Sequence, residues 1–147
     1  LPNLAAFSSG FLISSSREGA AFEGYVERMR IKISGHAQIA GTLSGGNQQK
    51  VVLAKWLQRN ADVIIFDEPT RGIDVGAKFE IYQLIHGLAE QGKAILMISS
   101  ELPEILGMSD RIIVMNEGRV TGEIEDCSAA TQESVMKLAT HREEVAA

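Results

Sequence analysis

Two short apolar runs separated by one amphipathic segment constrain the fold of this chain most strongly. The runs are residues 63–66 and 94–99, and each has the length expected of a strand that is buried on both faces. Asp74 is expected to cap the intervening helix at its start, and Gly92 is expected to end it. The apolar face of that helix consists of Ile81, Leu84, Ile85 and Leu88. This order of elements predicts an α/β fold with a parallel sheet and helical crossovers.

Elements on both sides extend this pattern. Residues 44–58 are expected to form a helix with Trp56 in the core, closed near Asn60 because asparagine tolerates the left-handed conformation. A short helix capped by Ser100 is expected after the second run. Residues 111–124 contain Asn-Glu-Gly between two apolar stretches, which predicts an antiparallel hairpin.

The two ends of the chain differ from this central part. Residues 1–43 are rich in Ser, Gly and Ala, and only residues 20–33 show the three- and four-residue spacing of an amphipathic helix. Residues 128–141 are expected to form a last helix.

Composition narrows the classes of function. The chain has 147 residues and a net charge of −5, from 14 Lys and Arg against 19 Asp and Glu, which disfavours a nucleic-acid-binding protein. Its one cysteine, Cys127, excludes an internal disulfide framework and fits a reducing compartment. No stretch approaches the roughly 18 apolar residues that a membrane-spanning helix needs.

Two adjacent carboxylates, Asp67 and Glu68, directly follow the first apolar run. Functional groups gather beyond the carboxyl ends of parallel strands, and paired carboxylates there call for a compensating cation. Asp67 is the candidate Mg²⁺ ligand, and Glu68 is the candidate base that orients and deprotonates an attacking water. The simpler alternative is an acidic strand end that faces solvent.

A glycine-containing turn precedes the helix at 44–58. The two glycines let backbone N–H groups approach an anion at a helix N-terminus, Ser44 adds a hydroxyl, and Gln48 and Gln49 add amide donors. This arrangement predicts a phosphate-binding site. The alternative is an ordinary serine cap after a flexible turn.

Several motifs in a fixed order resemble one family, the ABC ATPases. The sequence LSGGNQQK at residues 43–50 resembles their signature motif, and VIIFDEPT at 63–70 resembles their Walker B strand. RGIDVGAK at 71–78 resembles the D-loop of ribose-, xylose- and galactose-type sugar importers. Residues 99–104 and 110–118 resemble the second, C-terminal nucleotide-binding domain of those duplicated ATPases. The resemblance is continuous over about residues 42–125 and looser over 1–41.

The resemblance implies roles for individual residues. Asp67 would hold Mg²⁺, Glu68 would be the general base, and Asp74 would lie at the seam between two nucleotide-binding domains. The residues implied to contact ATP held by the opposing nucleotide-binding domain are Ser44, Gly45, Gly46, Asn47 and Gln48.

The same resemblance implies a fold, partners and a location. The fold would be part of a RecA-like P-loop NTPase, with 1–43 from the helical subdomain, 44–126 from the nucleotide-binding core and 127–147 as a C-terminal helix and tail. The whole protein would hydrolyse ATP with Mg²⁺ to import a monosaccharide. It would work with membrane-spanning permease subunits on the cytoplasmic face of a bacterial inner membrane.

Two departures from the family pattern matter. No phosphate loop of the form G-x-x-x-x-G-K-S/T is present; residues 72–78 imitate one, but they have three residues between the glycines and are followed by Phe79. The missing half is expected upstream of Leu1, so the chain is interpreted as a fragment that hydrolyses essentially no ATP alone and tends to self-associate. Ser100 stands where the family carries a catalytic histidine, which makes it a second catalytic candidate with shorter reach.

The sequence is also compatible with two other classes of function. One is an ABC-type head of a DNA-repair ATPase, which would bring coiled-coil heptads and a basic face that this sequence lacks. The other is a non-catalytic interaction module derived from an ABC ATPase.

Overall fold

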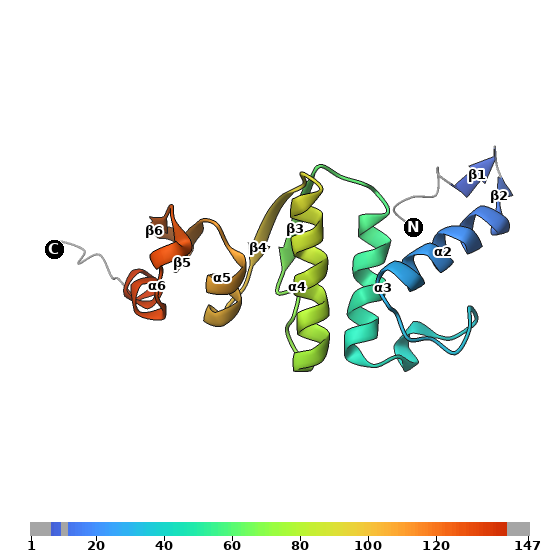
Figure 1. Ribbon diagram of the computed structural model, residues 1–147, viewed down its shortest axis with the longest axis horizontal. Coiled ribbons are helices and arrows are strands. Elements are labelled where there is room, and N and C mark those ends of the chain that lie inside the picture. Colours follow the sequence, from blue (N-terminus) through green and yellow to red (C-terminus); the bar gives the residue numbers. More distant parts are fainter. Residues whose placement is uncertain (1–6, 10–11, 141–147) are drawn as a thin grey trace. The chain divides into compact units, whose positions relative to one another are not determined.

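The computed structural model describes residues 7–9 and 12–140, and it divides into two compact units, 1–97 and 98–147 (Figure 1). The elements of the first unit are β1 (Ser8–Ser9), β2 (Leu12–Ile13), α2 (Ser15–Arg28), the 3₁₀ turn η1 (Ala40–Thr42), α3 (Gly45–Leu57), β3 (Val63–Asp67), α4 (Val75–Glu90) and β4 (Ala94–Ile98). The elements of the second unit are α5 (Leu102–Met108), β5 (Ile112–Asn116), β6 (Arg119–Ile124), the 3₁₀ turn η2 (Cys127–Ala129) and α6 (Gln132–Ala139).

The predicted strand–helix–strand unit is confirmed as β3, α4 and β4. β3 and β4 are neighbours in a parallel sheet. The carboxylate of Asp74 accepts a hydrogen bond from the backbone N–H of Ala77 at 3.0 Å, so it caps α4 as expected. Gly92, with φ of +82°, follows the helix end. The buried side chains of the helix are Ile81, Ile85 and Leu88, three of the four predicted.

The two strands are not buried on both faces, contrary to the prediction. Phe66 is buried, but the side chains of Val63 and Ile65 are each 63% exposed and that of Leu96 is 50% exposed. Exposure alternates along both strands, which shows that one face of this sheet is uncovered within the described residues.

α3 lies beside α4 in the first unit (Figure 1). It ends before Asn60, which has the predicted left-handed backbone with φ of +50°. The prediction that Trp56 belongs to the core is wrong, because its side chain is 59% exposed. The buried face of α3 consists instead of Gly46, Lys50 and Leu53.

The helix near the start of the chain is displaced from its predicted range. α2 begins at Ser15, because the hydroxyl of Ser14 caps it by accepting from the N–H of Arg17, and it ends at Arg28 rather than at residue 33. The following turn carries Met29 and Ile31 into the core through Arg30, whose φ is +50°.

The second unit is built on the predicted hairpin. β5 and β6 are antiparallel, with Ile112 opposite Ile124 and Asn116 opposite Arg119. The two residues between the strands, Glu117 and Gly118, both have positive φ, as a type I′ turn requires. The core of the unit consists of Ile112, Val114 and Val135.

Two helix boundaries in this unit differ from prediction. Ser100 does not cap α5: Glu101 occupies the N-cap position, and Ser99 is the serine that accepts from its backbone N–H, at 3.0 Å. The last helix is shorter than residues 128–141, because α6 starts only where the side chains of Thr131 and Ser134 cap it reciprocally.

Candidate functional site

The signature turn, which we define as residues 43–48, lies at the N-terminus of α3 in the first unit. Ser44 is exposed at the N-cap position, but its hydroxyl makes no capping bond to the helix. The backbone N–H groups that follow it belong to the first turn of α3, where an α-helix leaves such donors without partners in the helix. An exposed hydroxyl and backbone donors therefore meet at a positive helix end, which suits a phosphate group.

Gly46 brings the signature turn into contact with the start of α4. A Cβ at position 46 would lie 2.6 Å from the Cβ of Ala77 and 3.9 Å from a carboxylate oxygen of Asp74. A Cβ at Gly45 would lie 4.0 Å from the carbonyl oxygen of Gly72. The structure therefore places the signature residues and the predicted D-loop next to each other.

The amide side chains of this turn are engaged with the protein. The side-chain oxygen of Asn47 accepts from the backbone N–H of Lys32 at 2.9 Å, and its Nδ2 donates to Ser44 Oγ at 3.0 Å. Nε2 of Gln48 donates to the backbone carbonyls of Leu43 at 2.8 Å and Gly41 at 3.3 Å. These hydrogen bonds hold the turn in shape, and the contacts of Asn47 and Gln48 with a nucleotide stay a prediction.

Asp67 and Glu68 lie at the carboxyl end of β3, where the sequence predicted them. Asp67 is exposed, and Glu68 has a left-handed backbone with φ of +47°, which is uncommon for a residue with a side chain. The next two residues, Pro69 and Thr70, are almost completely buried. These two buried residues hold in place the turn that separates the carboxylates of Asp67 and Glu68. Such a backbone at a non-glycine residue is typical of functional sites, and no motif or spacing around Glu68 indicates it.

The geometry around Asp67 fits a magnesium ion that is shared with phosphates. Among residues 7–9 and 12–140 there is no group of three or more His, Cys, Asp or Glu side chains that can hold a metal ion by itself. Mg²⁺ in nucleotide sites is held by only one or two carboxylates, together with phosphate oxygens and water. One exposed carboxylate at a strand end meets that requirement.

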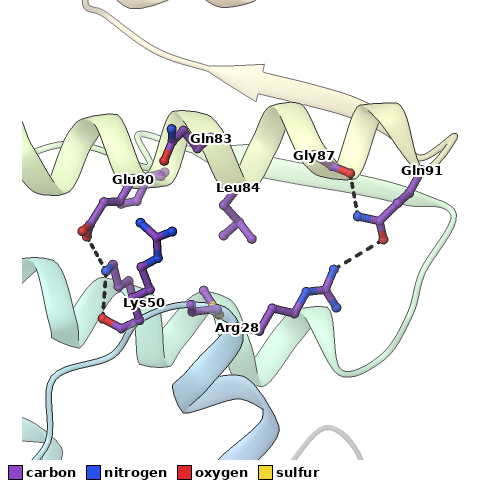
Figure 2. A pocket seen from close by; sticks show the side chains of 10 residues that line it. Arg28, Lys50, Glu80, Gln83, Leu84, Gly87 and Gln91 are labelled. Atoms are coloured by element: carbon purple, nitrogen blue, oxygen red, sulfur yellow. Dashed lines mark hydrogen bonds and ion pairs between the residues drawn. The ribbon is translucent and has the colours of Figure 1, made fainter.

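Behind the signature turn lies a buried ion pair that no sequence motif indicates. Lys50 is 5% exposed; its ammonium group forms an ion pair with Glu80 of α4 and donates to the backbone carbonyl of Arg30 at 3.3 Å (Figure 2). These residues line a pocket of about 240 Å³, where Arg28 also donates to Gln91. The spacing of Gly46, Lys50 and Leu53 on one helical face was the signal, since it places a lysine among buried positions.

Ser100, the other catalytic candidate, belongs to the second unit and is exposed. Its neighbour Ser99 donates to the carboxylate of Glu104, which is only 3% exposed. This pair joins the residue two positions before the N-cap of α5 to the first turn of that helix. Glu104 was not singled out in the sequence, because an acidic residue in a first helical turn is ordinary.

Cys127 is a free cysteine of intermediate exposure. Burial raises the pKa of its thiol, and the nearby charges of Asp126 and Asp110 raise it further. A raised pKa lowers the fraction of nucleophilic thiolate at neutral pH.

The chain is similar to known ATP-binding proteins of transporters. It is 57% identical to the ribose import ATP-binding protein RbsA of Bacillus subtilis and 54% identical to the L-arabinose transport ATP-binding protein AraG of Geobacillus stearothermophilus. Each alignment covers 140 residues, or 95% of this chain. It spans only about a quarter of the length of these relatives (28% and 27%).

The structure is similar to solved cassettes. A dimeric bacterial ABC transporter cassette superposes with a TM-score of 0.66 at 26% identity, over 82% of this chain and 52% of the cassette. No helix in the described part of the chain is both long and apolar enough to span a bilayer. Residues 3–71 match the ABC transporter family. Together with the relatives, this match shows that the chain belongs to the ABC transporter family.

Proposed function

We propose that this chain supplies the signature helix and the Walker B strand of an ATP-hydrolysing subunit of a bacterial monosaccharide importer. The observation that carries the proposal is the exposed N-terminus of α3, where LSGGNQQK packs against the loop before α4 through Gly46. The names of the relatives, a ribose import protein and an L-arabinose transport protein, support a monosaccharide as cargo.

The signature turn would act on ATP held by an opposing nucleotide-binding domain. The hydroxyl of Ser44 and the backbone N–H groups of Gly45 and Gly46 would donate to the γ-phosphate, with Asn47 and Gln48 beside them. Fixed donors of this kind stabilise charge as it develops in phosphoryl transfer. Asp74, which contacts the first turn of α3, would lie at the seam between the two domains and couple the two sites.

The end of β3 would serve the second ATP site. Asp67 would hold Mg²⁺, which neutralises phosphate charge when it is bound. Glu68 would orient a water molecule and take its proton, and Ser100 would donate one hydrogen bond where a histidine is usual in the family. An uncharged hydroxyl of short reach makes this site the slower of the two.

The remaining assignments follow from the same proposal. Residues 1–43 would belong to the helical subdomain that faces membrane-spanning permease subunits, 44–126 to the nucleotide-binding core and 127–147 to a C-terminal helix and tail. The protein would then work peripherally on the cytoplasmic face of the inner membrane, without nucleic acid as a partner.

A chimera tests the proposal. The aligned stretch of the Bacillus subtilis ribose import protein is replaced by this chain, and ATP hydrolysis and ribose uptake are measured in cells that lack the original protein. We expect both activities to be retained, and we expect the combined substitution of Ser44→Arg and Glu68→Gln to abolish them. A folded chimera that hydrolyses no ATP would contradict the proposal and favour a non-catalytic interaction module.

A further inference from the structure

We infer that Asn47 is a positioning residue that directs the hydroxyl proton of Ser44 toward the phosphate, and that its own side chain does not bind the nucleotide. This inference rests on the proposed function of the signature turn. Asn47 would then act on the phosphate only through Ser44. The resemblance to the family, by contrast, implied a direct contact of Asn47 with the nucleotide.

The orientation of the Asn47 amide is determined by the backbone of the preceding loop. The N–H of Lys32 donates at 2.9 Å to the amide oxygen, since a backbone N–H can only donate. The amide nitrogen must then point the other way, and it lies 3.0 Å from Ser44 Oγ. Nδ2 has only hydrogens to offer, so Ser44 Oγ is the acceptor in this bond.

Because Ser44 accepts the hydrogen bond from Asn47, the proton of its own hydroxyl stays available. A serine hydroxyl has one proton and two lone pairs, and the bond from Asn47 occupies a lone pair. Among the described residues, the structure gives Ser44 no acceptor for that proton, and its side chain makes no capping bond to α3. Ser44 is exposed, so the proton can be donated to a group arriving from outside.

The neighbouring donors point to the same ligand. Gly45 and Gly46 form the first turn of α3, where backbone N–H groups and the helix dipole favour an anion. A phosphate oxygen at this position would receive the Ser44 proton. A hydroxyl that is already oriented loses less freedom on binding than one that rotates freely.

The substitution Asn47→Asp distinguishes an effect on the direction of the Ser44 proton from an effect on folding. The new carboxylate has nearly the same shape and still accepts from the N–H of Lys32, but it also accepts the Ser44 proton and so removes it from the phosphate. An acidic side chain in the first helical turn is favourable for α3, so the substitution does not lower stability. We expect kcat/KM for ATP in the chimera to fall at least about tenfold, with an unchanged melting temperature.

A double-mutant cycle distinguishes this role from a merely structural one. In the Ser44→Ala background there is no hydroxyl to orient, so Asn47→Asp should lower kcat/KM clearly less than it does with Ser44 present, and the remaining loss reflects repulsion between the new carboxylate and the phosphate. Asn60→Asp, the same chemical change just beyond the other end of α3, is the matched control and should leave kcat/KM within about twofold of the unsubstituted chimera. Equal losses from Asn47→Asp with and without Ser44 would overturn the inference.

A second measurement uses the 147-residue chain itself and does not depend on ATP hydrolysis. Hydrogen exchange at the Lys32 amide should accelerate at least about tenfold in Asn47→Ala and remain slow in Asn47→Asp. Unchanged exchange in Asn47→Ala would overturn the inference even if the chimera is active. An inactive unsubstituted chimera, by contrast, would contradict only the proposed function.

Discussion

Single residues decide which groups the candidate site presents. The left-handed backbone of Glu68, held by buried Pro69 and Thr70, turns the chain sharply after Asp67. The two carboxylates can therefore have separate roles. Gly46 decides how closely the signature turn approaches the loop before α4, because no other residue lacks the Cβ that would clash there.

The first prediction compares the two proposed ATP sites. In the chimera, Ser44→Arg should remove most ATP hydrolysis, because a bulky side chain fills the phosphate position of the signature turn. Glu68→Gln should remove less, because in the proposed function Ser100 replaces the family's histidine at the ATP site that Glu68 would serve. Steady-state ATPase rates check this. Loss of activity in Glu68→Gln together with full activity in Ser44→Arg would show that the order of importance is reversed.

The second prediction concerns the contact at Gly46. Gly46→Ala should lower the free energy of unfolding by about 1–3 kcal/mol, because its Cβ would lie 2.6 Å from that of Ala77 and the two helices would have to separate. Gly24→Ala is the control, since position 24 of α2 has no neighbouring atom within 4 Å. There the helix propensity of alanine should leave stability unchanged or raise it by up to about 1 kcal/mol. Urea denaturation of both variants measures the difference.

At the scale of elements, α3 and α4 are joined at two successive points. Gly46 meets Ala77 at the start of the helices, and the Lys50–Glu80 ion pair follows one turn later along both. Lys50 also donates a hydrogen bond to the carbonyl of Arg30, which joins the loop after α2 to the same point. The signature turn and the predicted D-loop are therefore held in register by the helices that follow them.

The third prediction concerns the asymmetry of that ion pair. The side chain of Lys50 is 6% exposed and that of Glu80 is 38% exposed. Removal of Glu80 therefore leaves a buried charge unpaired, whereas removal of Lys50 leaves a charge that water can reach. Glu80→Ala leaves a buried ammonium without its counter-ion and should cost about 3 kcal/mol of unfolding free energy. Lys50→Met should cost less, because it fills the same space without charge and Glu80 can reach water.

An exposed contact between two polar side chains on the same helix provides the control. His86 and Glu90 are 3.5 Å apart and both are more than two-thirds exposed. Glu90→Ala should therefore change the unfolding free energy by no more than about 0.5 kcal/mol. If Glu80→Ala cost as little as Glu90→Ala in the same denaturation experiment, the Lys50 pair would not stabilise the helix packing.

At the scale of the whole molecule, the first unit exposes an apolar sheet face. Val63, Ile65 and Leu96 are half or more exposed on β3 and β4. From their apolar sequence, these side chains were expected to be buried. The solved cassette of similar fold is about twice as long as the part of it that this chain matches.

The fourth prediction follows from this exposed face. At micromolar concentrations the 147-residue chain should form dimers or larger species, because apolar strand faces associate when they are uncovered. Light scattering should show a lower mean mass for Ile65→Lys, which places a charge on the face, and an unchanged mass for Ile65→Val. A monomer at all concentrations would contradict the expected self-association.

Local patterns in the sequence predicted most elements but not their surroundings. The cap at Asp74, the left-handed Asn60 and the turn at Glu117 and Gly118 were predictable because each depends on a few adjacent residues. The exposure of Trp56 and of the strand faces was not predictable, because burial depends on which other elements are present. The roles of Asp67, Glu68 and Ser44 remain proposals, supported by their positions at a strand end and a helix start.

The sequence by itself determined the order of elements, the family of the chain and the residues available for chemistry. These depend on apolar periodicity, local capping and short motifs, which act over a few residues of the chain. Only the tertiary structure decided that Lys50 pairs with Glu80 and that the Asn47 amide lies between Lys32 and Ser44. Such contacts depend on how segments distant in the sequence pack together, since a hydrogen bond or buried ion pair forms only at short range and in the right direction.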